Sequence, residues 1–298
     1  MTDCTIVIPT HNRADLLARA VVSALRACPP DGEVLVVDDH SRTPASEVLL
    51  GLQDVRLRVV RNSGTGGAAC ARNLGVEQAR GELIFFLDDD DEITADYCSR
   101  ILAFNGPSRS AEWGFSSTMV REGQVISSDS LRTRKRLRRG LIPRSAWLRE
   151  RIAAMSDGLW IQKELFLRVG GLDPRQTIDE DTDLCVRLQI AGSVPWYETE
   201  PGVVVYRGYT PTSAAAAQLT VATPAARGLD CYRRTHDKNA DFFNAFSSDR
   251  WFLSTRFLRR AVKTGKANEA LKFVREQRPW PFALALWVFV SVKRLAHR

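Results

Sequence analysis

Four consecutive aspartates at residues 88–91 are the side chains with the clearest potential for chemistry. They follow the apolar run 83–87, which predicts a buried strand. Carboxylates packed so closely raise one another's pKa by about 1–3 units unless a cation lies between them. Mg²⁺ or Mn²⁺ takes one or two protein carboxylates together with phosphate oxygens and water. Asp88 and Asp90 are therefore predicted to hold such an ion, and the alternative is a solvated turn that caps the next helix.

A second acidic group opens a predicted helix over residues 181–191, which ends at Gly192. A carboxylate near the N-terminus of a helix is expected to be ionised at neutral pH and able to accept a proton from a hydroxyl group. The alternative is an acidic first helical turn with no catalytic role. The sequence does not show which carboxylate faces a cleft, since four are close together: Asp179, Glu180, Asp181 and Asp183.

The elements that must position these acids alternate between strand and helix in the first 90 residues. Apolar runs that predict strands lie at residues 5–9, 33–37, 57–60 and 83–87, and helical spacing appears at residues 16–25 and 73–79. Nearly continuous apolar runs are typical of strands covered on both faces, so we predict an α/β fold with a mostly parallel sheet. Ligands of such sheets bind beyond the carboxyl ends of the strands, where these polar side chains lie.

The pattern is weaker beyond residue 110. Residues 113–126 are interpreted as strands, and the arginine-rich run 132–139 as a loop. A stretch rich in alanine, threonine and proline at residues 210–226 marks a boundary near Ala226. We therefore expect one domain over residues 1–225, followed by a helical, basic C-terminal extension over residues 226–298.

Several segments resemble glycosyltransferase family 2, the inverting enzymes with the GT-A (Rossmann-like) fold. They cover roughly residues 5–192, about two thirds of the chain. The resemblance implies a mixed, mostly parallel sheet flanked by helices, and transfer of a sugar from a nucleoside diphosphate to an acceptor hydroxyl. The segments are TIVIPTHNR at 5–13, VVDDHS at 36–41, ARNLG at 71–75, ARGELIFFLDDDDEI at 79–93, GLWIQKELFLRVGGLD at 158–173 and IDEDTDLCVRLQIAG at 178–192.

The resemblance also implies roles for single residues. Asp88 and Asp90 match the metal motif of the family, which implies bound Mn²⁺ or Mg²⁺, and Asp181 matches the catalytic base. A metal ion and an arginine would stabilise the charge that develops on the departing diphosphate. Trp160 is expected either to stack on a sugar ring or to pack in the core. The positions expected to bind the nucleotide-sugar are Pro9, Thr10, Asn12, Arg13, Asp38, Asp39, Arg72, Asp88, Asp89, Trp160 and Glu180. The chain departs from the family after Asp39, where His40-Ser41 replaces the usual glycine-serine pair.

The expected partners are a nucleotide-sugar donor, with a UDP-sugar favoured, and a glycan or lipid-linked acceptor in bacterial surface polysaccharide, lipopolysaccharide or glycolipid assembly. Residues 251–298 carry eleven lysine and arginine residues against two glutamates, a composition that suits an anionic membrane surface. The apolar run 281–292 is shorter than the ~20 residues that cross a bilayer. It is expected either to lie at the membrane interface or to pack on the protein's own core or on a second subunit. With no recognisable secretion signal, we expect a cytoplasmic protein, peripheral to the inner face of the plasma membrane.

Other functions were weighed against this one. Residues 64–69 satisfy the GxGxxA fingerprint of an NAD(P)-dependent oxidoreductase, but they follow the third strand, and the acidic run would repel a dinucleotide. A non-catalytic nucleotide-sugar-binding protein of the same fold is a second alternative. No nucleic acid is expected as a partner, because residues 132–139 contain no aromatic side chain for base stacking. The six cysteines lack zinc-site spacing and are expected to be buried thiols, and the oligomeric state is left open.

Overall fold

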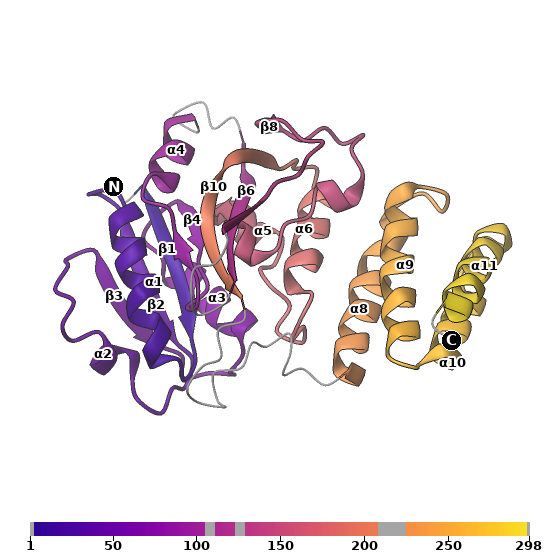
Figure 1. Cartoon of the computed structure of the whole chain (residues 1–298), viewed down its shortest axis with the longest axis horizontal. Helices are drawn as coiled ribbons and strands as arrows, with labels where there is room; N and C mark the ends of the chain where they lie inside the picture. The colour runs from indigo at the N-terminus through magenta and orange to yellow at the C-terminus, as the bar shows by residue number, and fades with distance from the viewer. Residues whose placement is uncertain (1–2, 105–110, 123–128, 208–224, 297–298) are drawn as a thin grey trace.

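A mixed β-sheet flanked by helices forms the first two thirds of the protein (Figure 1). The computed structural model describes residues 3–104, 111–122, 129–207 and 225–296. The strand order is β3-β2-β1-β4-β9-β6-β10-β5, with β7 (Asp129–Arg132) paired to β6 and β8 (Gly140–Leu141) paired to β10. The α/β class and the helical C-terminal region expected from the sequence are confirmed.

The parallel part of the sheet contains the strands that the sequence predicts. These are β3 (Leu57–Arg61), β2 (Glu33–Asp38), β1 (Cys4–Thr10) and β4 (Leu83–Phe86), which pair in that order and in parallel. The remaining strands make the sheet mixed. β9 (Trp160–Gln162) is antiparallel to β4 and to β6 (Trp113–Glu122), and β10 (Trp196–Arg207) is parallel to β6 but antiparallel to β5 (Glu92–Ile93).

Helices on both faces explain why β1 is apolar at successive positions. Ile6 and Ile8 belong to the core beneath α1 (Ala14–Ala27), whereas Val7 belongs to the core beneath α3 (Ala68–Gln78). Glycine at position 75 lets α3 lie directly against β1, because a Cβ there would be 2.4 Å from Cγ1 of Val7. This close approach holds the preceding turn of α3, which carries Arg72, near the ends of the strands.

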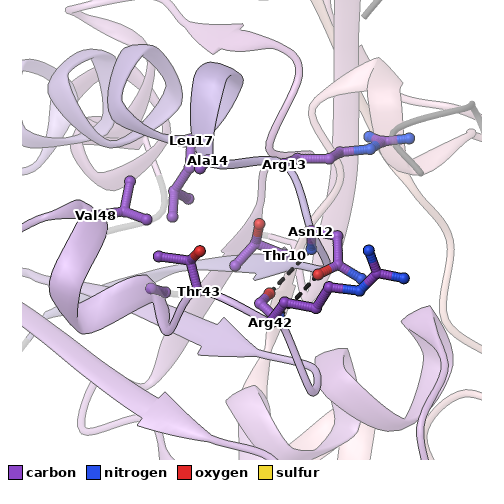
Figure 2. A pocket seen from close by; sticks show the side chains of 10 residues that line it. Thr10, Asn12, Arg13, Ala14, Leu17, Arg42, Thr43 and Val48 are labelled. Carbon is purple, nitrogen blue, oxygen red and sulfur yellow. Dashed lines mark hydrogen bonds between the residues drawn. The ribbon is translucent and has the colours of Figure 1, made fainter. Parts of the chain in front are cut away.

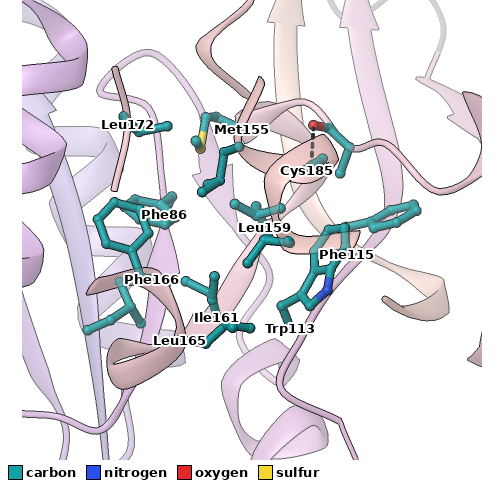
Figure 3. Close-up of a cluster of buried hydrophobic side chains, with 14 of the residues drawn as sticks. Phe86, Trp113, Phe115, Met155, Leu159, Ile161, Leu165, Phe166, Leu172 and Cys185 are labelled. Carbon is teal, nitrogen blue, oxygen red and sulfur yellow. Dashed lines mark hydrogen bonds between the residues drawn. The ribbon is translucent and has the colours of Figure 1, made fainter. Parts of the chain in front are cut away.

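The core beneath α3 continues across the far half of the sheet to the helices that follow it. α5 (Lys163–Arg168) and α6 (Glu180–Ile190) pack here, and α6 matches the predicted helix 181–191 to within one residue at each end. Figure 3 shows the side chains that fill this core. They include Phe86, Trp113, Phe115, Met155, Leu159, Ile161, Leu165, Phe166, Leu172 and Cys185.

The C-terminal extension is helical and has a small core of its own. It consists of α8 (Ala225–Asn239), α9 (Ser248–Lys263), α10 (Ala267–Glu276) and α11 (Trp280–Ala296), and α8 lies beside α6 (Figure 1). Its core includes Phe257, Leu258, Phe273, Phe282, Leu286 and Val290. Over the described residues, no helix combines the length and hydropathy that a membrane crossing requires.

Several weaker predictions are also accounted for. β6 lies within the predicted strand region 113–126, of which residues 123–126 fall outside the described part of the chain. Residues 133–139 of the arginine-rich run form an irregular connection between β7 and β8, as expected of a loop. All six cysteines are free thiols; five are buried, and Cys70 is partly exposed.

Candidate active site

The carboxyl ends of β1, β2 and β4 bring the predicted site residues to one edge of the sheet. The backbone N–H of Asp39, just after β2, donates to the carbonyl oxygen of Thr10 at the end of β1, over 2.8 Å. The hydroxyl of Thr10 in turn donates to Oδ2 of Asp89, just after β4, over 2.7 Å. Three segments that are distant in sequence therefore meet at this edge.

The four consecutive aspartates do not all face the same way. Asp89 is buried and turns towards β1, where it accepts hydrogen bonds from Thr10 and from Nη1 of Arg13, the latter at 2.8 Å. Asp88, Asp90 and Asp91 instead form a group in which one carboxylate oxygen from each lies within 4.8 Å of the others. Asp91 joins them because the chain turns, with its N–H donating to the carbonyl of Asp88.

This group has the chemistry of a divalent-cation site. Burial, followed by the charges of Asp88 and Asp90, raises the pKa of Asp91 to about 9, and burial and Asp88 also raise the pKa of Asp90. Carboxylates that repel one another this strongly favour a cation between them, and three hard oxygen donors suit Mg²⁺ or Mn²⁺. Asp88 and Asp90 lie where the sequence predicts, whereas Asp91 was not predicted as a ligand.

Arg72 connects this acidic group to the start of α6. Its side chain is only 7% exposed; Nη2 donates to Asp88 over 2.6 Å and Nη1 to Glu180 over 3.2 Å. Its Nε is buried and has no hydrogen-bond partner among the described residues. An unpaired buried N–H of a charged group is costly, and the bonds of Nη1 and Nη2 to the two acids offset that cost.

The structure separates the four acids of residues 179–183 into two kinds. Asp179 and Asp183 are buried and bonded to the C-terminal extension. Asp179 accepts from Thr235 of α8 over 2.7 Å and from Arg256 of α9, and Asp183 accepts from Lys238 and Asn239 of α8, over 2.9 and 3.0 Å. These two carboxylates are therefore used to hold the helix.

Glu180 and Asp181 are only partly buried, and they are the acids left for chemistry. Glu180 pairs with Arg72, whereas the carboxylate of Asp181 accepts from the backbone N–H of Thr182 over 2.6 Å. Burial, then the charges of Glu180 and Asp179, raise the pKa of Asp181 to about 7. The expectation of a fully ionised carboxylate at neutral pH is therefore wrong, because desolvation and neighbouring acids outweigh the helix N-terminus.

A cavity of about 190 Å³ lies beside this edge of the sheet, between α1 and the short helix α2 (Ala45–Val48) (Figure 2). Ligand sites usually measure about 300–1,000 Å³, so this one can take part of a ligand, such as a base or a sugar ring. Pro9, at the end of β1, is partly exposed next to it. The cavity is lined by Thr10, Asn12, Arg13, Ala14, Leu17, Ser41, Arg42, Thr43, Ala45 and Val48.

Asn12 joins the two loops that border the cavity. Its backbone N–H donates to Oγ of Ser41 over 3.0 Å, and its side-chain oxygen accepts from the N–H of Arg42 over 2.8 Å (Figure 2). Arg13, also expected at the nucleotide, forms ion pairs with Asp89 and Asp90 at 2.8 and 3.0 Å. It therefore links the cavity to the acidic group.

Asp38 and Asp39 shape the loop rather than line the cavity. Asp38 accepts from the N–H groups of Ser41 and Ala45 over 2.8 and 3.1 Å, and Asp39 accepts from Nδ2 of Asn62 over 2.8 Å. Between them and Ser41, His40 has φ +62°. Glycine adopts this conformation without strain, which explains why glycine is usual where this chain has histidine.

The structure decides between the alternatives for two features. Trp160 is fully buried, with its ring centroid 5.8 Å from that of Phe104, so the suggestion that it stacks on a sugar is wrong and core packing describes it. The glycine-rich segment 64–69 follows β3 at the edge of the sheet, and the N–H of Gly67 donates to Oδ2 of Asp39 over 2.7 Å. An amide already bonded to a carboxylate is not free for a pyrophosphate, so the dinucleotide fingerprint is not supported.

The contribution of the C-terminal extension was missed by sequence reasoning. Arg256 and Lys238 count among its basic residues, yet both point inward and pair with acids around α6. Their partners are 77 and 55 positions away in the sequence, and no local pattern signals such pairs.

Comparisons with known proteins find similarity to glycosyltransferases. The family model described as Glycosyl transferase family 2 matches residues 5–106. An uncharacterized glycosyltransferase of Haemophilus influenzae is 28% identical over 206 residues, which cover 66% of this chain and 66% of that protein. A Campylobacter jejuni protein named GalNAc(5)-diNAcBac-PP-undecaprenol beta-1,3-glucosyltransferase is 34% identical over 105 residues, which cover 34% of each chain.

Solved structures extend the similarity over the whole fold. S. aureus TarS 1-349 in complex with UDP-GlcNAc has a TM-score of 0.68 at 14% identity, covering 99% of this chain and 88% of that chain. This similarity confirms the GT-A architecture. The chain spans no more than two thirds of the length of the two curated relatives above.

Proposed function

Residues 5–106 match the model of glycosyltransferase family 2, and we propose that this chain belongs to that family and transfers a sugar from a nucleoside diphosphate to an acceptor hydroxyl group with inversion at the anomeric carbon. The observation that carries the proposal is the position of Arg72, bonded to Asp88 on one side and to Glu180 on the other. This single side chain joins a cation-binding group to the helix that carries Asp181. A leaving diphosphate needs positive charge close to it, and an attacking hydroxyl needs a base near by.

Each residue then has a defined task. Asp88, Asp90 and Asp91 would hold Mg²⁺ or Mn²⁺, which when bound supplies charge to stabilise the departing diphosphate. Arg72, held between Asp88 and Glu180, would supply positive charge close to the diphosphate. Asp181 would take the proton of the acceptor hydroxyl as that oxygen bonds to the anomeric carbon and the bond to the diphosphate breaks.

We assign the nucleoside to the cavity beside Thr10 and Asn12. Arg13 and Asp89 connect that cavity to the acidic group, which is the arrangement that a base on one side and a diphosphate on the other require. Asp38 and Asp39 contribute by fixing the loop that carries Ser41 and the cavity wall.

We propose a UDP-sugar as the donor, in line with the TarS structures in complex with UDP-GlcNAc and with UDP. A thermal-shift screen of UDP-, GDP-, dTDP- and CMP-sugars, each with and without Mn²⁺, tests this, since ligands that bind the native state raise its melting temperature. A UDP-sugar should give the largest shift, and only with Mn²⁺ present. Stabilisation by NAD(P) alone would overturn the proposal, and tight binding without release of UDP would indicate a non-catalytic binding protein.

The proposed acceptor is a glycan or a lipid-linked glycan of a bacterial surface polymer. The Campylobacter relative is named for an undecaprenol-linked acceptor, and such acceptors lie at a membrane. The outer face of α11 suits that location. It exposes a stripe of large apolar side chains, which consists of Trp280 (71%), Leu284 (52%), Trp287 (51%), Val288 (49%) and Val292 (58%).

The opposite face of α11 is packed. Phe282, Leu286 and Val290 are buried in the core of the extension, so packing on the protein's own core describes this face of the helix. Lys293 is exposed at its end, in a region with many basic side chains. We propose that the exposed stripe lies in the headgroup region of an anionic membrane, at the cytoplasmic leaflet, with tryptophan at the interface.

Vesicle co-sedimentation tests this location. The double variant Trp280→Ser/Trp287→Ser should lose binding to phosphatidylglycerol-containing vesicles, whereas Trp147→Ser should not, although Trp147 is 56% exposed. Equal binding by both variants would contradict the proposal. Concentration-dependent dimerisation that the double variant abolishes would assign the stripe to a second copy of the chain instead.

A further inference from the structure

The C-terminal extension reaches the acids of α6 through Arg256. This residue of α9 donates from Nε to Oδ1 of Asp179 over 3.0 Å, and from Nη2 to the same carboxylate and to the hydroxyl of Thr182, the latter over 2.9 Å. Its guanidinium also lies over the ring of Tyr232 of α8, 4.9 Å from the centroid. Asp179 and Thr182 flank Glu180 and Asp181 in the sequence, so Arg256 bonds to the residues on both sides of these two acids.

Asp179 has a backbone conformation that requires support. Its φ is +69° and its ψ +10°, in the left-handed region, directly before the first residue of α6. A residue other than glycine is uncommon in this region and is strained unless its surroundings hold it there. Thr235 bonds one carboxylate oxygen of Asp179 and Arg256 the other, so two helices of the extension fix this turn. The direction in which α6 starts, and with it the position of Asp181, depends on these bonds.

We propose that Arg256 is a positioning residue for the transfer reaction, which orients Asp181 through Asp179 and Thr182 and supplies the positive charge that keeps its carboxylate usable as a base. This inference rests on the proposed function. It gives the extension a role in catalysis that is separate from any role at a membrane.

The charges around Asp181 agree with this role. Asp179 and Glu180 raise its pKa, whereas Arg256 lowers it. Asp181 also interacts electrostatically with Arg72 from α3, Tyr232 from α8 and Cys185 from the next turn of α6. Arg72 already pairs with Asp88 and Glu180, whereas Arg256 pairs with Asp179 and lowers the pKa of Asp181.

The experiment compares Arg256→Gln and Arg256→Lys with the matched control Arg260→Gln. Arg260 lies one turn along α9, with its guanidinium 5.9 Å from the centroid of the same Tyr232 ring. Within the described part of the chain it forms no hydrogen bond or ion pair with α6. Arg260→Gln therefore removes a positive charge from the same helix and leaves the bonds to Asp179 and Thr182 in place.

The release of UDP from the donor sugar is the first readout. Arg256→Gln should lower kcat at pH 7 by about tenfold or more, change the donor KM by less than about twofold and move the acid limb of the kcat profile up by about one pH unit. Arg256→Lys should recover most of that shift, because it keeps the charge. A wild-type pH profile in Arg256→Gln, or the same shift in Arg260→Gln, would overturn the inference. Should Arg256→Gln fail to fold, Thr235→Val decides: it should lower kcat at unchanged KM, and wild-type kcat would contradict the positioning role.

The second readout needs no turnover and separates this inference from the proposed function. At pH 8, Asp181→Asn is introduced into the wild type and into Arg256→Gln. It should raise the melting temperature by at least about 2 °C more in Arg256→Gln, because the ionised carboxylate of Asp181 lacks its counter-charge in that background. Additive shifts would mean that the two side chains are not coupled. Absence of UDP release from every donor would count against the proposed function alone, whatever this comparison shows.

Discussion

Nη2 of Arg72 donates to Oδ1 of Asp88 over 2.6 Å, and this contact joins the end of β4 to α3 in the centre of the proposed active site. The same guanidinium reaches Glu180 at the start of α6. The buried guanidinium of Arg72 therefore lies between two groups of acids that are more than 80 residues apart in the sequence.

Asp181→Asn is predicted to keep donor binding and to lose transfer. A general base contributes about 10²–10⁴-fold to a rate, so kcat should fall by at least about 100-fold, while the thermal shift caused by the donor stays the same. Asp96→Asn, at an exposed position, is the matched control. Transfer at an undiminished rate in the Asp181 variant would remove this residue from the mechanism.

The rate of transfer is predicted to fall as the pH is lowered through about 7. The pKa of Asp181 is raised to about 7, so the carboxylate is protonated below that pH and cannot accept the proton of the acceptor. We expect kcat to fall about tenfold for each pH unit below the pKa. A profile measured between pH 5.5 and 9 checks this, and a flat line from pH 5.5 to 7 would be the contradicting result.

Arg72→Lys is predicted to weaken donor binding by about 10- to 100-fold, because a lysine cannot bond two acids and a phosphate in the fixed planar geometry of arginine. Titration of the donor in the presence of Mn²⁺ measures the effect. Arg80→Lys, two residues beyond the end of α3 and 66% exposed, serves as the control and should bind as the wild type does. Equal affinities in the two variants would show that Arg72 does not contact the donor.

Lys238→Met is predicted to lower the free energy of unfolding by ~2 kcal/mol, since it leaves the buried carboxylates of Asp173 and Asp183 without this partner. Lys266→Met, which removes an exposed pair with Glu269, should cost less than about 0.5 kcal/mol. Urea unfolding measures both. Similar losses in the two variants would mean that Lys238 does not anchor α6.

The parts of the fold that the sequence predicts are those set by local pattern. Helices on both faces of β1 and β2 require apolar residues at every position, and the polar residues after each strand mark the edge where ligands bind. Asp88 and Asp90 could be predicted because the run of acids directly follows a predicted strand and matches the metal motif of the family that the sequence resembles. Asp91 was missed because a turn, not an extended strand, brings it back to Asp88.

Other features depend on contacts that no local pattern encodes. Trp160 and a sugar-stacking tryptophan look alike in a sequence, and only the strands and helices around it show that it is enclosed. In the sequence, Arg256 and Lys238 look like surface charges, and only the packing of the extension against α6 shows that they pair with buried acids. The pKa of Asp181 likewise follows from burial among Glu180 and Asp179, which outweighs the helix N-terminus.

The central claim is that Asp88, Asp90 and Asp91 hold a divalent ion next to the diphosphate of the donor. Anomalous diffraction from crystals grown with UDP and Mn²⁺ tests it most directly. The predicted result is a manganese peak within about 2.5 Å of carboxylate oxygens of Asp88 and Asp90, in contact with the diphosphate. A diphosphate bound with no manganese at these carboxylates, or manganese bound elsewhere in the protein, would contradict the account.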